Sequence, residues 1–373
     1  MRYLKLICAA LCLFILSSVL LSMSHWNERR IPDDICYLRQ AHLFQKLGVA
    51  GLNTDARLDT DKYFRGMAEQ LGHPEWATDH LYICHVYKSN AGKWVLQYPP
   101  GTGFLLAFFP EGFQAVPLYM ICTGILFGIG LFGIYLAKDW GEVLAATVLG
   151  GFALYLMINP TKVSYSSAPT MVLTALTGLA TARFFREADL RRIGASGILV
   201  AVLLGLMVNF RIPNLLLCAG YFSVFLFFFL KTRDIRVVLS GAVFAVFCLL
   251  GMSPTLIANT INAGSPFSTT YGNIDVVAPV FSPEIAWFYI FDNQGVLMIV
   301  SLIWMGWMLS SEPGPGTTRI VILTTVNLLV SAAFFFTHPI SSAYYMMPVA
   351  MLSVWTLLFN RLIWSRKPVA AAI

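Results

Sequence analysis

Long apolar segments alternate with short polar connections along most of this chain. Ten segments carry few charges, and the first of them covers residues 4–22. The others cover residues 116–137, 143–158, 169–185, 193–210, 212–230, 237–258, 295–309, 320–337 and 344–359. Because roughly 20 apolar residues in an α-helix cross a hydrocarbon core, each segment is a candidate membrane span. The pattern therefore predicts an all-α, polytopic transmembrane helical bundle of about 10 spans.

The first apolar segment admits two interpretations. Apart from Lys5 near its start, residues 4–22 carry no charge. The segment is longer than the roughly 7–15 apolar residues of a secretory signal, which favours an uncleaved membrane anchor. The alternative is a cleaved signal peptide, because Ser22, Met23 and Ser24 form an acceptable small-residue cleavage site.

The overall composition agrees with a membrane protein. The chain of 373 residues is 57% hydrophobic and 12% charged, with a mean hydropathy of +0.70. Soluble domains are roughly 45–50% apolar and 25% charged. Lipid is therefore the expected solvent for most of the chain.

The distribution of Lys and Arg predicts the orientation. If the N-terminus is cytoplasmic, the inner segments hold fourteen of the 25 basic residues, and the short outer loops hold only Lys162 and Arg211. The remaining nine lie in one long loop, and long loops are largely exempt from the positive-inside rule. We therefore expect a multi-pass protein of the inner (cytoplasmic) membrane with both termini in the cytoplasm. The net charge of +6 then reflects topology and indicates no nucleic-acid partner.

Residues 24–103 form the one long loop, which is expected to be external and folded. It holds nine of the 19 acidic residues, and we treat it as part of a single domain that covers residues 1–373. Within it, residues 32–47 are predicted to form a helix with Asp33 and Asp34 at its positive N-terminal end and Gly48 after its last turn. An apolar stripe predicts that this helix lies along the membrane surface; its members are Tyr37, Leu38, Ala41 and Phe44.

Two of the seven cysteines, Cys36 and Cys84, lie in this external loop. In an oxidising compartment they could form a disulfide that ties the surface helix to the later part of the loop. His80, Cys84 and His85 could instead suggest a metal site, but their spacing matches no common zinc pattern. The other five cysteines lie in predicted spans, where they serve as small packing residues.

Polar and ionisable groups gather at the predicted outer face of the membrane. Charged residues are costly in lipid, so those that lie against the spans indicate function. The candidates are Asp33 and Asp34, residues 97–103 with Tyr98, Lys162, residues 209–214 with Arg211, residues 264–272 with Tyr271, and His338.

In their order and placement, four of these motifs resemble the polyprenyl-phosphate-sugar-dependent glycosyltransferases of the C-type membrane fold (GT-C). That group includes protein O-mannosyltransferases and the aminoarabinose transferases of lipid A. The motifs are Pro32-Asp33-Asp34 with Tyr37, Tyr98-Pro99-Pro100-Gly101, Arg211 with Pro213, and residues 265–272. The resemblance covers most of the chain, and the order of the motifs makes it more specific than any one of them.

The resemblance implies an inverting transfer of a sugar from a polyprenyl phosphate to an acceptor hydroxyl outside the membrane. It gives Asp33 the role of general base, while Asp34 would orient the acceptor or bind a divalent metal. A cation must meet the leaving phosphate, and Arg211 is the first candidate, with Lys162 second. Tyr98, Tyr271 and His338 are the expected substrate contacts. No other cofactor is expected, and the acceptor would be a glycolipid, a polysaccharide or a protein.

Two departures from the family pattern stand out. Many relatives carry an Arg-Tyr pair before the last span, but this chain has Tyr344-Tyr345 there, with no arginine. The aminoarabinose transferases have a lysine before the Pro-Pro pair, where this chain has Tyr98, so that substrate is not expected.

Structural roles remain open for the same residues. Asp33 could simply cap a helix, Arg211 could anchor the membrane interface, and Pro99 and Pro100 could only start a helix. Two other functional classes also remain: a transporter or flippase for lipid-linked substrates, and a non-catalytic scaffold subunit of a glycan-assembly system.

Overall fold

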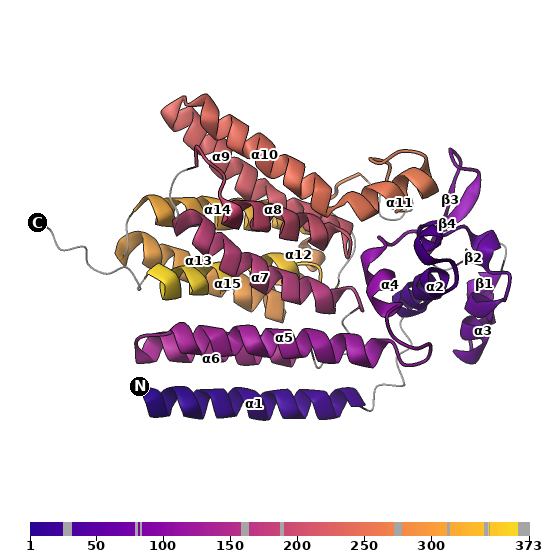
Figure 1. Cartoon of the computed structure of the whole chain (residues 1–373), viewed down its shortest axis with the longest axis horizontal. Coiled ribbons are helices and arrows are strands. Elements are labelled where there is room, and N and C mark those ends of the chain that lie inside the picture. The colour runs from indigo at the N-terminus through magenta and orange to yellow at the C-terminus, as the bar shows by residue number, and fades with distance from the viewer. Residues whose placement is uncertain are drawn as a thin grey trace, which may run out of the picture.

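A computed structural model describes residues 1–24, 32–78, 81–82, 84–157, 164–186, 190–271, 278–311, 314–338, 342 and 344–364. Long helices run side by side in a bundle, and a smaller region packs at one end of it (Figure 1). The long helices are α1 (Arg2–Ser24), α5 (Ala115–Leu136), α6 (Trp140–Leu156), α7 (Ser167–Arg186), α8 (Ala195–Val208), α9 (Cys218–Thr232), α10 (Ile235–Gly251), α13 (Asn293–Ser311), α14 (Pro315–Thr337) and α15 (Met347–Trp364).

Shorter elements build the end region and the connections. The helices are α2 (Pro32–Leu47), α3 (Tyr63–Gln70), α4 (Gly101–Leu106), α11 (Ser253–Ala263) and α12 (Pro283–Phe291). Short 3-10 helices are η1 (Gly48–Leu52), η2 (Ala56–Leu58), η3 (Pro74–Trp76) and η4 (Ile212–Leu217). Two antiparallel hairpins pair β1 (Ala77–Thr78) with β2 (Leu81–Tyr82), and β3 (His85–Lys88) with β4 (Lys93–Leu96). In the second hairpin Val86 lies opposite Val95.

Apart from these hairpins, the regular secondary structure of the described residues is helical, as the apolar pattern predicts, and each of the ten apolar segments overlaps at least one helix. Among the described residues, five helices are long and apolar enough to cross a membrane: α1, α5, Ile212–Thr232, α13 and α14. A sixth is possible if α10 and α11, bent by 60° at a break, form one span. The predicted number of about 10 spans is therefore not confirmed.

The difference arises because the inner helices are short or carry polar residues. The helices α6, α8 and Met347–Ile363 are apolar but shorter than 18 residues. α7 carries four threonines that are buried against the protein: Thr170, Thr174, Thr177 and Thr181. Trp355 of α15, the helix that packs most extensively on α7, is fully buried. A helix surrounded by other helices does not need the uniform apolarity of one that faces lipid.

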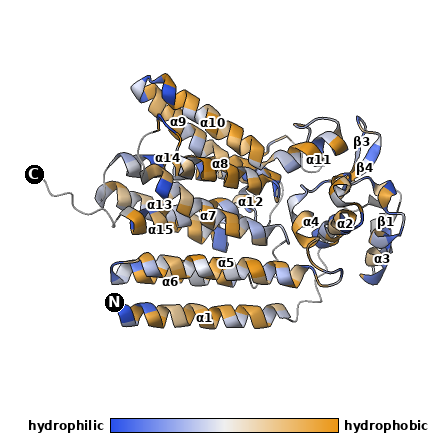
Figure 2. Cartoon of the chain, viewed as in Figure 1, coloured by the Kyte–Doolittle hydropathy of each residue, from blue (hydrophilic) through white to orange (hydrophobic). Residues whose placement is uncertain are grey.

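The bundle and the smaller region differ in hydropathy. Hydrophobic residues colour most of the length of the bundle helices, whereas hydrophilic residues are concentrated near helix ends and in the smaller region (Figure 2). Large side chains such as Phe14, Val148 and Ile303 remain exposed on the bundle surface. Apolar surface exposed over several long helices is typical of a protein embedded in a membrane.

The smaller region has a core of its own. It consists of Ile35, Cys36, Phe64, Ala68 and Leu96, all with at most 4% of their surface exposed. A disulfide joins Cys36 to Cys84, the pair that the sequence suggested, and it links α2 to the start of β3. α2 ends at Leu47 and Gly48 follows with φ +57°, the left-handed conformation expected of a glycine that ends a helix.

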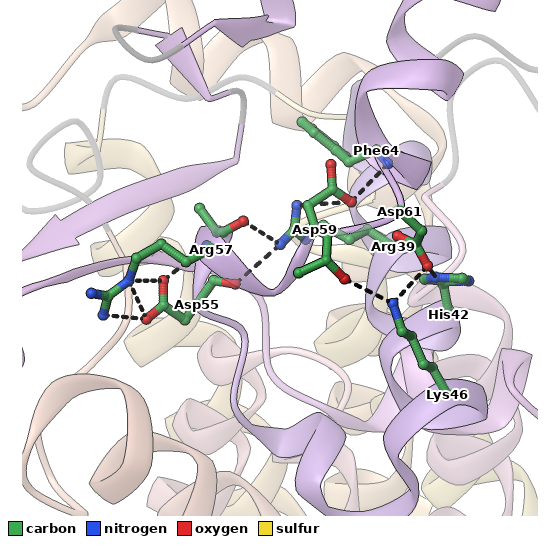
Figure 3. Close-up of polar contacts among 10 residues, drawn as sticks. Arg39, His42, Lys46, Asp55, Arg57, Asp59, Asp61 and Phe64 are labelled. Carbon is green, nitrogen blue, oxygen red and sulfur yellow. Dashed lines mark hydrogen bonds and ion pairs between the residues drawn. The ribbon is translucent and has the colours of Figure 1, made fainter.

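Several of the crowded acids in this region prove to be structural partners (Figure 3). The buried Arg39 donates hydrogen bonds to the carbonyls of Asp55 and Ala56, and its guanidinium lies 3.7 Å from a carboxylate oxygen of Asp59. Asp61 accepts from Lys46 at 2.8 Å and contacts His42 at 2.8 Å. The hydrogen bond from Lys46, opposed by partial burial and reinforced by His42, holds the pKa of Asp61 below its usual range.

α11, which follows α10 of the bundle, is hydrogen-bonded to the smaller region. The side chain of Asn262 accepts a hydrogen bond from the backbone of Thr54 at 3.0 Å and donates one to the carbonyl of Leu52 at 2.7 Å. Figure 1 views α2 nearly end-on, whereas the long helices run across the picture. α2 therefore crosses the direction of the bundle, an orientation that suits a helix beside a membrane surface.

The disulfide gives the first prediction. Titration of the denatured but unreduced protein should find five free thiols, and Cys36→Ser should raise that number to six because Cys84 is released. Loss of the cross-link over 48 residues should lower the free energy of unfolding by about 2–4 kcal/mol. As a control, Cys122→Ser should lower the thiol count to four, and seven thiols in the unreduced wild type would disprove the bond.

Candidate functional site

Asp33 lies in the first turn of α2, half-buried, and two tyrosines from distant parts of the chain reach its carboxylate. The hydroxyl of Tyr98 donates a hydrogen bond to Oδ1 at 2.7 Å. The hydroxyl of Tyr344 lies 3.4 Å from Oδ2, a longer and weaker contact. The carboxylate is thus oriented through one oxygen, while the other makes the looser interaction.

Arg211, which precedes η4, lies on the other side of Tyr344. The guanidinium carbon is 4.4 Å from the centre of the Tyr344 ring and 4.7 Å from that of Tyr345. Its Nη1 donates to the carbonyl of Tyr344 at 3.2 Å, and only 6% of the residue is exposed. Cation–π contacts on two rings hold this charge in a partly desolvated position. Tyr344 therefore connects the arginine with the carboxylate of Asp33.

Further aromatic rings complete the surroundings of Asp33. The ring of Tyr37 lies 4.8 Å from that of Tyr98, and Tyr271 approaches Tyr98 edge-on at 6.4 Å. Burial, together with the negative charge of Asp33, raises the pKa of Tyr98 well above its usual value. Tyr98 therefore remains a protonated hydrogen-bond donor to Asp33 across the physiological pH range.

The motif around Tyr98 is docked against the end of α8, immediately before Arg211. Pro99 and Pro100 lead into α4, and the backbone N–H of Gly101 donates to the carbonyl of Asn209 at 2.7 Å. The side chain of Asn209 in turn accepts hydrogen bonds from the backbone and the hydroxyl of Thr255, at the start of α11. Two motifs separated by more than a hundred residues thus meet because backbone contacts hold them together.

The side chains of the adjacent acids Asp33 and Asp34 point in different directions. Asp34 is 2% exposed, and its Oδ1 lies 3.4 Å from the backbone nitrogen of Tyr165, so it faces the protein interior. Successive residues on a helix point about 100° apart, which explains the divergence. The geometry brings Asp33, but not Asp34, to Tyr98 and Tyr344.

The remaining predicted site residues have different surroundings. His338 lies at the end of α14, where its Nδ1 donates to the carbonyl of Phe334 at 2.6 Å and its ring stacks on Phe334. Among the contacts described, none connects His338 with Asp33 or Arg211. Tyr271 accepts a hydrogen bond from Lys88 through its backbone carbonyl and approaches the site with its ring. Lys162 lies outside the described residues.

Sequence reasoning missed two kinds of contact. Tyr344 and Tyr345 were noticed only because no arginine accompanies them, yet they are the residues on which Arg211 stacks. Ser164 and Ser166 hydrogen-bond to Tyr37, and no motif marks them. The paired aromatic residues before the last helix were a usable signal, because a buried arginine needs aromatic or polar partners.

A metal site receives no direct support from the geometry. Within the described ranges, no group of three His, Cys, Asp or Glu side chains could hold a metal ion. Cys84 is committed to the disulfide, and His85 is buried with its ring edge-on to Phe64. His80 lies outside the described residues.

Comparisons with protein-family models, with curated proteins and with solved structures find no match to this chain. Functional inference therefore depends on the residues of the site and on their arrangement.

The docking at Gly101 can be tested with an added methyl group. An ideal Cβ at Gly101 would lie 2.5 Å from the carbonyl oxygen of Asn209, which is backbone and cannot swing away. Gly101→Ala should therefore lower the free energy of unfolding by about 1–3 kcal/mol through overpacking. At Gly66 in α3 nothing lies within 4 Å of the added atom, so Gly66→Ala should stabilise the helix by about 0.5–1 kcal/mol. Equal melting temperatures for the two variants would contradict the close approach.

Proposed function

We propose that this protein is an inverting membrane glycosyltransferase of the GT-C type, which moves a sugar from a polyprenyl phosphate to an acceptor hydroxyl at the external membrane face. The observation that carries the proposal is the link through Tyr344 between the carboxylate of Asp33 and the guanidinium of Arg211. The carboxylate can accept the proton of an acceptor hydroxyl, and the guanidinium can bind the phosphate of a lipid donor. Both groups lie at the end of a bundle of apolar helices.

Asp33 is the proposed general base. Since Tyr98 holds Oδ1 at 2.7 Å, Oδ2 is the oxygen that turns toward the acceptor, and its 3.4 Å contact with Tyr344 is readily exchanged. The acceptor oxygen forms a bond to the anomeric carbon and gives its proton to Asp33. The bond from that carbon to the phosphate oxygen breaks, and its electron pair leaves with the polyprenyl phosphate.

Arg211 is the proposed partner of the leaving phosphate. Its guanidinium can donate several N–H bonds in a fixed plane, which matches phosphate oxygens better than a lysine ammonium does. The two tyrosine rings position it in advance, so little reorganisation accompanies the growth of negative charge. Relatives with an Arg-Tyr pair would place a cation near Tyr344 from the same segment, whereas here the cation comes from the start of η4.

The rest of the proposal concerns location and partners. The chain would lie in the inner membrane with both termini in the cytoplasm, so that the Asp33 site faces outward, where polyprenyl-linked sugars are consumed. Asp34 becomes a positioning residue for α2, and Lys162 remains a second candidate for the phosphate. The acceptor would be a glycolipid, a polysaccharide or a protein hydroxyl.

The base is tested by Asp33→Asn, which keeps the shape and the hydrogen bond from Tyr98 but removes the basic oxygen. In an assay of the purified protein with polyprenyl-phosphate sugar, the turnover number should fall by about 10²–10⁴-fold. Glu75→Gln, an exposed acid in the same region, should leave turnover unchanged. Undiminished transfer by Asp33→Asn would overturn the assignment, and donor translocation without sugar transfer would instead indicate a flippase.

The cation is tested by Arg211→Lys, which keeps the charge but loses the planar stack on Tyr344 and Tyr345. We expect weaker use of the donor, with kcat/KM for the polyprenyl-phosphate sugar reduced by about tenfold or more, because a bidentate phosphate contact is lost. The melting temperature of Arg211→Lys shows whether a loss of stability contributes to the fall in kcat/KM. The matched control is Arg57→Lys, at an exposed ion pair. An unaltered kcat/KM would remove Arg211 from the donor site.

A further inference from the structure

A second candidate site lies at the end of the bundle farthest from Asp33. There the turn between α5 and α6 and the C-terminal ends of α13 and α15 lie near one another (Figure 1). A groove of about 510 Å³ opens between α6, α13 and α15. This volume is within the roughly 300–1,000 Å³ of small-molecule sites in general. Its walls are apolar, and its lining includes Ala145, Val300, Ile303, Trp304, Trp307 and Leu358.

The groove lies on a surface that lipid would cover. α13 is one of the helices long and apolar enough to cross a membrane, and Ile303 and Trp307 on it are exposed by 68% and 45%. α6 and α15 are shorter apolar helices beside it. Exposed apolar side chains on three such helices need an apolar occupant, and in a membrane the acyl chain of a lipid is available.

Three charged groups stand at one end of this groove. Arg361 Nε lies 3.2 Å from Glu142 Oε1, and Arg361 Nη2 lies 3.9 Å from Asp139 Oδ2. The guanidinium carbon of Arg361 also lies 5.3 Å from the ring centre of Trp307. Glu142 is buried, and its other oxygen accepts from the backbone of Lys138 at 2.7 Å. The acid is therefore fully engaged in the structure.

Asp139 has a different environment. Its Oδ1 caps α6 by accepting the backbone N–H of Glu142 at 2.8 Å, whereas its side chain is 51% exposed. The 3.9 Å separation of Oδ2 from Arg361 is too long for a hydrogen bond. Among the side chains that line the groove, one guanidinium and two carboxylates sum to a net charge of minus one. A purely anionic headgroup would add to that charge, whereas an ammonium would offset it.

We propose that this groove binds a zwitterionic aminophospholipid, with its acyl chain on Ile303, Trp304 and Leu358, its phosphate facing Arg361 and its ammonium bound by Asp139. A primary ammonium is required because it donates N–H bonds to a carboxylate, which a quaternary choline group cannot do. The site would hold the ends of α6, α13 and α15 together through a lipid, apart from the Asp33 site.

The test uses the full-length protein in detergent with equal amounts of phosphatidylethanolamine, phosphatidylcholine and phosphatidylglycerol that carry identical acyl chains. Native mass spectrometry should show one phosphatidylethanolamine retained, about fivefold to tenfold more than either other lipid, as one half-exposed charged hydrogen bond would provide. Asp139→Asn should reduce this retention to the level of phosphatidylcholine. The melting temperature without lipid should stay the same, because asparagine caps a helix as well as aspartate does.

Two further variants sharpen the result. Asp234 caps α10 in the same way and pairs with Arg191, outside the groove, so Asp234→Asn should keep full phosphatidylethanolamine retention. Ala145→Phe fills the groove and should reduce the retention of all three lipids. Equal retention of the three lipids by the wild type, a preference for phosphatidylglycerol, or an unchanged preference in Asp139→Asn would each overturn the proposal.

Discussion

The hydrogen bond from the backbone of Gly101 to the carbonyl of Asn209 is the contact on which the candidate site depends. It joins the segment that carries Tyr98 to the end of α8, two residues before Arg211. No side chain intervenes at this point, because a Cβ on Gly101 would lie 2.5 Å from the accepting oxygen. Asn209 extends the link to Thr255, where the chain resumes as α11 after a 60° bend. One backbone hydrogen bond thus joins the smaller region to α8, and the side chain of the same Asn209 joins α8 to α11.

Around this link, each charged group of the site is held by aromatic residues as well as by polar ones. Tyr98 orients Asp33, and Tyr344 and Tyr345 surround Arg211. Tyrosine suits this place because its ring packs like an apolar side chain while its hydroxyl remains a donor. The same division appears at the far end of the bundle, where Trp307 lies beside the guanidinium of Arg361. At both ends, rings hold a charge close to the apolar interior.

Local sequence signals predicted the elements well and their relations less well. The apolar runs located the helices, Gly48 located the end of α2, and Cys36 and Cys84 were the right pair. The prediction of about 10 spans is not confirmed, because some apolar helices are short and threonines such as Thr174, buried between helices, lower the hydropathy of α7.

For the site, the sequence predicted that Asp33, Tyr98 and Arg211 lie at one face, and the structure brings Asp33 and Arg211 to Tyr344 and Tyr98 to Asp33. It could not show that Asp34 turns inward, because that depends on which face of α2 meets residue 165. Nor could it show that Tyr344 takes the place beside Arg211, since the contact joins segments 133 residues apart. Such relations follow from tertiary packing, which short motifs do not encode.

Asp33 and Tyr344 are separated by 311 residues along the chain. Because a chain is synthesised from its N-terminus, Asp33 and Tyr98 are made long before the two rings that hold Arg211. Until Tyr344 and Tyr345 follow, just before α15, the arginine lacks its aromatic support and the carboxylate lacks its link to the cation. The arrangement is thus completed only by the segment that leads into α15, so a chain terminated before residue 344 would lack the assembled centre even if its earlier helices had packed.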